Sequence, residues 1–130
     1  MRRHPVSLAE CGITQARYDE LRAICRQYQQ YKAEAAAIRR GEIDPRRRRL
    51  GAWHQSDPTG NQAVMMADNF ARRRAETIEA AAKATDRVLA KYILRSVTEG
   101  LRYEYLQPPC GEKQFYRARM RFYIELDMRI

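Results

Sequence analysis

Apolar residues recur at steps of three and four over most of this 130-residue chain, and this spacing is the feature that most constrains its fold. Such spacing places apolar side chains in one stripe along an α-helix, whereas a half-buried strand requires alternation at every second residue. Six glycines and five prolines interrupt the pattern, which is too few for the many turns of a β-sandwich. The sequence therefore predicts an all-α fold.

Two long helices are predicted in the first part of the chain, residues 1–84, where we expect a helical hairpin. The first runs from Thr14, a good N-cap residue, to about Arg40 and ends at Gly41. The second spans about 59–84 and follows the helix-starting pair Asp57-Pro58. The apolar stripes of these helices consist of Tyr18, Leu21, Ile24, Cys25, Tyr28, Ala35 and Ile38 in the first, and Val64, Ala67, Ala71, Ala75, Ile78 and Ala82 in the second.

Residues 41–60 read as a basic linker between these helices. It contains Trp53, which serves either to anchor the loop or as part of a partner surface. A block of like charge binds phosphates in some proteins and stays a solvated linker in others, and both readings remain open here. The linker's basic block consists of Arg46, Arg47, Arg48 and Arg49. A second run, Arg72 to Arg74, cannot lie on one helix face, and we expect it to be solvated.

The pattern of residues 85–130 predicts a helix-turn-helix unit. Thr85-Asp86 supplies an N-cap for a third helix at about 87–96. A short helix of about five to seven residues follows the loop that contains Gly100, and Pro108-Pro109 ends it because proline lacks the amide donor. The last helix then spans about 111–128. The expected core positions are Val88, Leu89, Tyr92 and Ile93 in the third helix, and Phe115, Ala118, Phe122 and Leu126 in the last.

The second helix of such a unit normally enters the major groove of DNA with its N-terminal residues near the base edges. Arginine and lysine read guanine there, and glutamine reads adenine, through paired hydrogen bonds. Arg119 and Arg121, further along the helix, are expected to meet phosphates. The candidates for the groove itself are Glu112, Lys113, Gln114, Tyr116 and Arg117.

The charge of the chain favours a polyanionic partner. Lysine and arginine number 25 against 16 acidic residues, for a formal net charge of +9, which indicates nucleic acid first and an anionic membrane surface second. No apolar run is long enough to cross a bilayer, and the N-terminus does not predict a secretory signal. The odd count of three cysteines favours a reducing compartment, so we expect a cytoplasmic location.

Enzymatic and metal-binding motifs are missing from the sequence. There is no phosphate-cradling glycine-rich loop, no nucleophile elbow and no zinc-protease motif. The two histidines, His4 and His54, have no neighbouring ligand at metal spacing. We therefore expect a protein that is not an enzyme and holds no metal or cofactor.

Several segments of the chain resemble one family of phage proteins. In the C-terminal third these are Val97-Thr98-Glu99-Gly100, Tyr103-Glu104-Tyr105-Leu106, Pro109-Cys110-Gly111 and Arg121-Phe122-Tyr123, and upstream Asp57-Pro58-Thr59-Gly60-Asn61 fits as well. Together they resemble the RinA/ArpU-type regulators of phages and prophages of Gram-positive bacteria. The resemblance implies control of late-gene transcription inside the host bacterial cell, through a unit similar to region 4 of sigma factors. Residues 117–121 depart from the more continuous basic run expected in that family.

The primary hypothesis is therefore a transcription regulator that binds double-stranded DNA through its last helix. Its N-terminal helices are expected to form a homodimer or to contact bacterial RNA polymerase. Two other classes remain: a DNA-packaging protein such as a small terminase subunit, and a protein that inhibits a host nucleic-acid enzyme. The mass of the protein in solution distinguishes a packaging protein from a regulator, since a ring of many subunits favours packaging. Binding to the host enzyme without DNA identifies the second.

Overall fold

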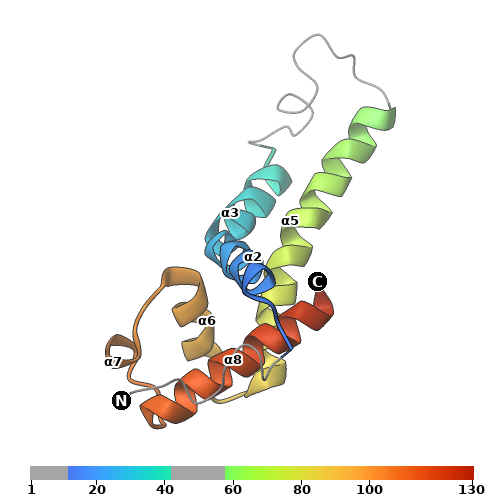
Figure 1. Cartoon of the computed structure of the whole chain (residues 1–130). Coiled ribbons are helices and arrows are strands. Elements are labelled where there is room, and N and C mark those ends of the chain that lie inside the picture. The colour runs from blue at the N-terminus through green and yellow to red at the C-terminus, as the bar shows by residue number, and fades with distance from the viewer. Residues whose placement is uncertain (1–11, 42–57) are drawn as a thin grey trace. The chain divides into compact units, whose positions relative to one another are not determined.

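The computed structural model describes residues 12–41 and 58–130, with the backbone alone for residues 58–69. All the regular secondary structure in these ranges is helical, which confirms the predicted fold class. The helices, shown in Figure 1, are α2 (Gln15–Arg26), α3 (Tyr28–Arg39), α5 (Pro58–Thr85), α6 (Ala90–Glu99), α7 (Tyr103–Leu106) and α8 (Glu112–Arg129). They form two compact units, one of Gln29–Glu76 and one that joins the chain up to Tyr28 with Thr77–Ile130.

The first long helix was predicted as one piece over 14–40, and this is wrong: it is interrupted at Gln27. Its start is as expected, because the Thr14 hydroxyl accepts a hydrogen bond of 3.1 Å from the Arg17 amide. At the interruption, the Gln27 amide donates to the Ile24 carbonyl three residues back, at 3.1 Å, and so tightens the last turn of α2. Neither proline nor glycine marks this point, so no local signal announced it.

The unit that holds the C-terminus has its core between α2, α6, α8 and the end of α5. Helices α2, α6 and α8 pack against one another, and α7 packs on α6 (Figure 1). The Tyr28 hydroxyl donates a hydrogen bond to the Glu79 carboxylate, which ties the start of α3 to α5. The largest side chains of this core are fully buried and match the predicted stripes: Leu21, Cys25, Ile78, Ile93, Phe115, Phe122 and Leu126.

Helix α6 begins later than the sequence predicted, at Ala90 in place of Arg87. Asp86 accepts hydrogen bonds from the amides of Val88 and Leu89, at 2.9 and 3.0 Å, and this holds residues 87–89 in a turn before the helix. Val88, predicted in the core, is therefore 65% exposed, whereas Leu89 and Ile93 are buried as expected. The error arose because the N-cap side chain stabilises a turn first and the helix only after it.

Helix α8 is separate from α7, as the proline pair predicted. Helix α7 is four residues long, shorter than expected, and ends at Gln107, whose φ of 50° lies in the left-handed region. Tyr103 fixes the intervening turn: its hydroxyl donates to the Cys110 carbonyl at 2.6 Å, and its amide donates to the Tyr116 hydroxyl at 3.3 Å. The entry of the chain into α8 is thereby held from both sides of the turn.

The unit of Gln29–Glu76 pairs α3 with the first part of α5. Ala35, which belongs to the predicted apolar stripe, and its neighbour Ala37 are buried. The Tyr31 and Phe70 rings meet edge to face with centroids 6.0 Å apart. Phe70 nevertheless keeps 54% of its surface exposed.

Candidate nucleic-acid interface

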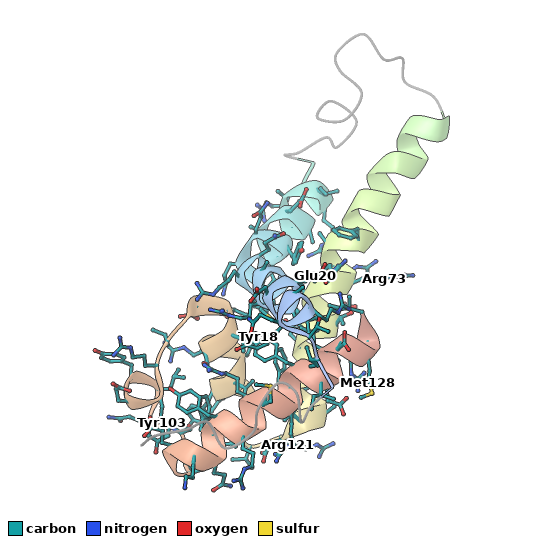
Figure 2. The ribbon with its side chains drawn as sticks, in the orientation of Figure 1. Tyr18, Glu20, Arg73, Tyr103, Arg121 and Met128 are labelled. Atoms are coloured by element: carbon teal, nitrogen blue, oxygen red, sulfur yellow. The ribbon has the colours of Figure 1, made fainter. Side chains whose placement is uncertain are left out.

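Helix α8 carries the candidate interface, and one of its sides is fully buried in the core while the other faces solvent. Phe115, Ala118, Phe122 and Leu126 have no exposed surface, as their spacing predicted. These buried side chains fix the rotation of the helix about its axis, and therefore decide which residues face solvent. Figure 2 shows the side chains along α8, with Arg121 and Met128 labelled.

The exposed side of α8 gathers four of the predicted site residues: Lys113, Gln114, Arg117 and Arg121. At about 100° per residue, they fall within an arc of about 100°. Three are cations, and within the described parts of the chain none of the four has an ion-pair or hydrogen-bond partner. This basic face of α8 therefore offers its donors entirely to solvent or to an anionic partner.

Tyr116 and Arg119, also predicted to face the groove or the phosphates, lie on a different side of α8. Arg119 donates a hydrogen bond of 3.0 Å to the Ser96 hydroxyl on α6, and its guanidinium stacks over the Tyr116 ring at 4.6 Å. Both side chains are half-buried. Of the seven predicted residues of α8, four thus form the outward basic face and Glu112 is exposed beside them, whereas Arg119 faces α6 and the Tyr116 hydroxyl accepts from the Tyr103 amide of α7.

The N-terminal end of α8 combines the positive end of the helix dipole with one acidic side chain. Gly111 is its N-cap residue and offers no side-chain oxygen to the first amides of the helix. These amides are the positive end of the helix dipole. The only carboxylate in the first turn belongs to Glu112, and it has no partner cation in the described chain.

The other predicted basic residues are placed less fully. Arg46, Arg47, Arg48 and Arg49, with Trp53, lie outside the described residues. Arg72 and Arg73 are exposed, whereas the Arg74 guanidinium stacks over the Phe70 ring at 5.2 Å. Arg72 and Arg73 are thus exposed as expected, whereas Arg74 departs from the expectation.

Sequence reasoning missed two groups of residues. Tyr103 acts as a positioning residue for α8, and no local pattern distinguishes it from the other tyrosines. Arg22 and Arg26, on α2, form the second group. Their spacing of four places two like charges on one side of the helix, which is mildly destabilising. This unfavourable pair was the signal in the sequence that could have indicated a functional role.

Comparison of the chain with protein-family models, with curated proteins and with solved structures found no match.

No helix within 12–41 and 58–130 combines the length and apolar character needed to cross a membrane. In the same ranges, no three histidine, cysteine or acidic side chains come together as a metal site. The described thiols differ in setting: Cys25 is buried and Cys110 is half-buried.

Proposed function

We propose that this protein binds double-stranded DNA through the basic face of α8. The observation that carries the proposal is the exposure of Lys113, Gln114, Arg117 and Arg121 on one side of a helix whose opposite side is fully buried. A helix of 18 residues is about 27 Å long, and the major groove admits a helix of this kind. The preceding turn and α7 give the segment the order of a helix-turn-helix unit.

The roles follow from the position of each residue along α8. Lys113, Gln114 and Arg117 occupy the first two turns, the part of a recognition helix that approaches base edges. Lysine and arginine donate to the acceptors of guanine, and glutamine pairs with adenine. Arg121 is one turn further on and contacts phosphate, which contributes affinity without reading sequence.

The biological role in this proposal is regulation of transcription in a phage or prophage, with late genes as the targets. Resemblance to the RinA/ArpU-type regulators supports this part of the proposal, and the charge and exposure of α8 support DNA binding alone. In this role the protein acts in the host cytoplasm, as a homodimer or together with RNA polymerase. Footprinting on the genome that encodes the protein tests it, because the proposal places the site beside a promoter and a site at a packaging origin contradicts it.

Salt dependence tests the binding mode. Each phosphate that a cation of the basic face neutralises contributes about −0.9 to the slope of log K against log[salt]. The phosphate contact of Arg121 alone therefore gives a slope of about −1, and the slope reaches about −3 where Lys113 and Arg117 also neutralise phosphates. Fluorescence anisotropy with a labelled duplex over a series of salt concentrations measures the slope. A flat response contradicts the proposal, because binding through these cations must release counterions.

Replacement of Arg117 by alanine separates base reading from simple attraction. We expect Arg117→Ala to weaken binding by about 1–3 kcal/mol and to reduce discrimination between sequences. Arg73→Ala is the matched control, since it removes the same charge from an exposed position on α5. Equal losses in the two variants contradict a specific role for α8, and a loss uniform across sequences makes Arg117 a phosphate contact.

A further inference from the structure

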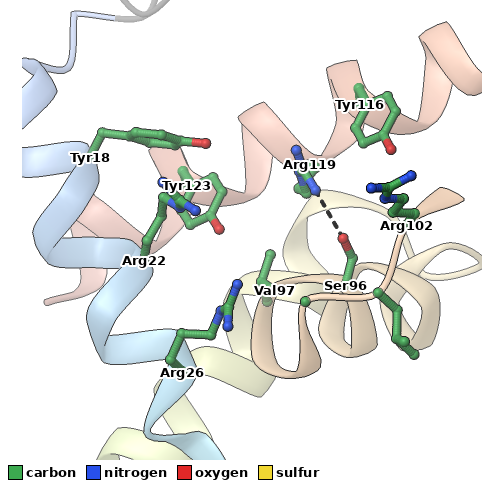
Figure 3. Close-up of a pocket in the computed structure, with 11 residues that line it drawn as sticks. Tyr18, Arg22, Arg26, Ser96, Val97, Arg102, Tyr116, Arg119 and Tyr123 are labelled. Carbon is green, nitrogen blue, oxygen red and sulfur yellow. Dashed lines mark hydrogen bonds between the residues drawn. The ribbon is translucent and has the colours of Figure 1, made fainter.

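A cleft of about 280 Å³ lies between α2, α6, α8 and the segment that leads into α7. Four arginines line it: Arg22, Arg26, Arg102 and Arg119 (Figure 3). None of its eleven lining residues is acidic, and three are tyrosines. All of them belong to the unit that holds the C-terminus. The cleft is therefore a concave site with concentrated positive charge, distinct from the outward basic face of α8.

The charges of this arginine cleft are poorly compensated by the protein. Arg22 lies over the Tyr18 ring at 5.5 Å, and within the described residues Arg26 has no ion pair. Arg102 reaches the Glu104 carboxylate at 3.9 Å, but both side chains are more than half exposed. An exposed pair at that distance contributes little. The fold thus brings four guanidinium groups from three segments together with one weak counter-charge, an arrangement that an anion would stabilise.

Arg119 is held in place before any ligand arrives. Its Nη1 donates to the Ser96 hydroxyl at 3.0 Å, and its planar group rests on the Tyr116 ring. Ser96 is 3% exposed, and its own hydroxyl proton has no acceptor among the described residues. One of the five guanidinium donors is used for positioning, which leaves the others and the Ser96 proton for an anion.

Gly100 allows the close approach of Arg26 to the wall of the cleft. This glycine ends α6 with a φ of 75°, and a Cβ there would lie 3.0 Å from Nη2 of Arg26. Tyr123 forms another part of the wall, and burial raises the pKa of its hydroxyl, so it stays neutral and adds no negative charge. The walls thus combine fixed donors with neutral aromatic surface.

We propose that the arginine cleft binds a small molecule that carries two or more phosphate groups. Guanidinium groups match phosphate oxygens bidentately, and several of them favour a polyanion over a single phosphate. The volume is close to the lower end of small-molecule pockets, which begin at about 300 Å³, so the cleft fits a nucleotide-sized ligand and excludes a duplex. Tyrosine rings offer an apolar surface to the remainder of such a ligand.

Calorimetric titration of the full chain, without DNA and at constant ionic strength, tests the proposal with ATP, tripolyphosphate and citrate as probes. We expect ATP to bind more tightly than citrate. Tight binding of tripolyphosphate also supports the proposal and shows that phosphates suffice, whereas binding of ATP alone supports it with a contribution from the tyrosines. Absence of binding by both phosphate probes overturns it.

Two glutamine variants locate the site. Arg26→Gln changes an exposed side chain of the cleft, and we expect it to weaken binding of the phosphate probe about tenfold or more, because a hydrogen bond between charged groups is lost. Arg117→Gln removes the same charge from the basic face of α8 and is expected to leave binding unchanged. Equal weakening by both variants overturns the proposal, because it indicates attraction to net charge alone.

A 5′-phosphorylated single-stranded oligonucleotide distinguishes the source of the phosphates. Weaker binding than ATP supports a free small molecule. Tighter binding that Arg26→Gln abolishes overturns the proposal in favour of a nucleic-acid end. Because these measurements contain no duplex, their failure leaves the test of DNA binding by α8 independent.

Discussion

Replacement of Phe122 by alanine tests the packing that orients α8. Phe122 has no exposed surface, and its ring meets Tyr123 edge to face with centroids 5.2 Å apart. Phe70 undergoes the same chemical change as a matched control. It is 54% exposed and contacts the Tyr31 ring and the Arg74 guanidinium. The two substitutions delete the same atoms, so a difference between them reflects the surroundings of the two rings.

The expected magnitudes follow from these environments. Removal of a fully buried phenylalanine ring costs about 3–5 kcal/mol, because the transfer free energy is lost and a cavity remains. Full burial of a phenylalanine side chain is worth about 1.5–3 kcal/mol, so the half-exposed Phe70 contributes about 1 kcal/mol through burial. Its cation–π contact adds about 0.5–1 kcal/mol. We therefore expect Phe122→Ala to be more destabilising than Phe70→Ala by about 2 kcal/mol.

Urea denaturation followed by far-ultraviolet circular dichroism measures both changes in the free energy of unfolding. Unchanged m values confirm that the same surface is exposed in all three proteins. A loss below about 1 kcal/mol for Phe122→Ala, or equal losses in the two variants, refutes the reasoning. A small loss means that Phe122 does not pack in the core and that the rotation of α8 is set by other contacts, whereas equal losses mean that burial does not distinguish the two rings.

Two further predictions concern Gly100 and Cys25. We expect Gly100→Ala to lower the free energy of unfolding by about 1–2 kcal/mol, because the left-handed φ of this residue disfavours a Cβ. Gly111→Ser is the control: residue 111 is an extended N-cap with open space around it, so this variant leaves the thermal midpoint of unfolding equal or higher. Burial raises the pKa of the Cys25 thiol from 9.0 to about 12, so the stability from its neutral form is present below pH 9 and is lost as the pH rises toward 12. The difference in unfolding free energy between wild type and Cys25→Ala should therefore shrink over that range in urea titrations, and a constant difference contradicts the assignment.

Local signals in the sequence were sufficient for most of the helices. The N-cap at Thr14, the start of α5 at Pro58 and the break at Pro108-Pro109 depend on the chemistry of a few adjacent residues, and the structure has all three. The inward stripe of α8 also follows from spacing alone. The interruption at Gln27 was missed because neither proline nor glycine marks it, and the exposure of Val88 was missed because the turn capped by Asp86 precedes the helix.

Part of the candidate site could be predicted from the sequence, and part required the tertiary structure. The sequence identified α8 and its cations, but seven side chains around one helix cannot all face one partner, and spacing alone does not say which of them turn toward α6. The hydrogen bond from Arg119 to Ser96 settles that for one arginine.

By itself, the sequence determined where most of the helices form, because helix propensity, capping and apolar period act over a few neighbouring residues. Only the tertiary structure brought Arg22 and Arg26 beside Arg102 and Arg119, and left Arg117 facing outward. The reason is physical: the packing of one helix against another fixes how each is rotated, and that rotation depends on residues far apart in the chain.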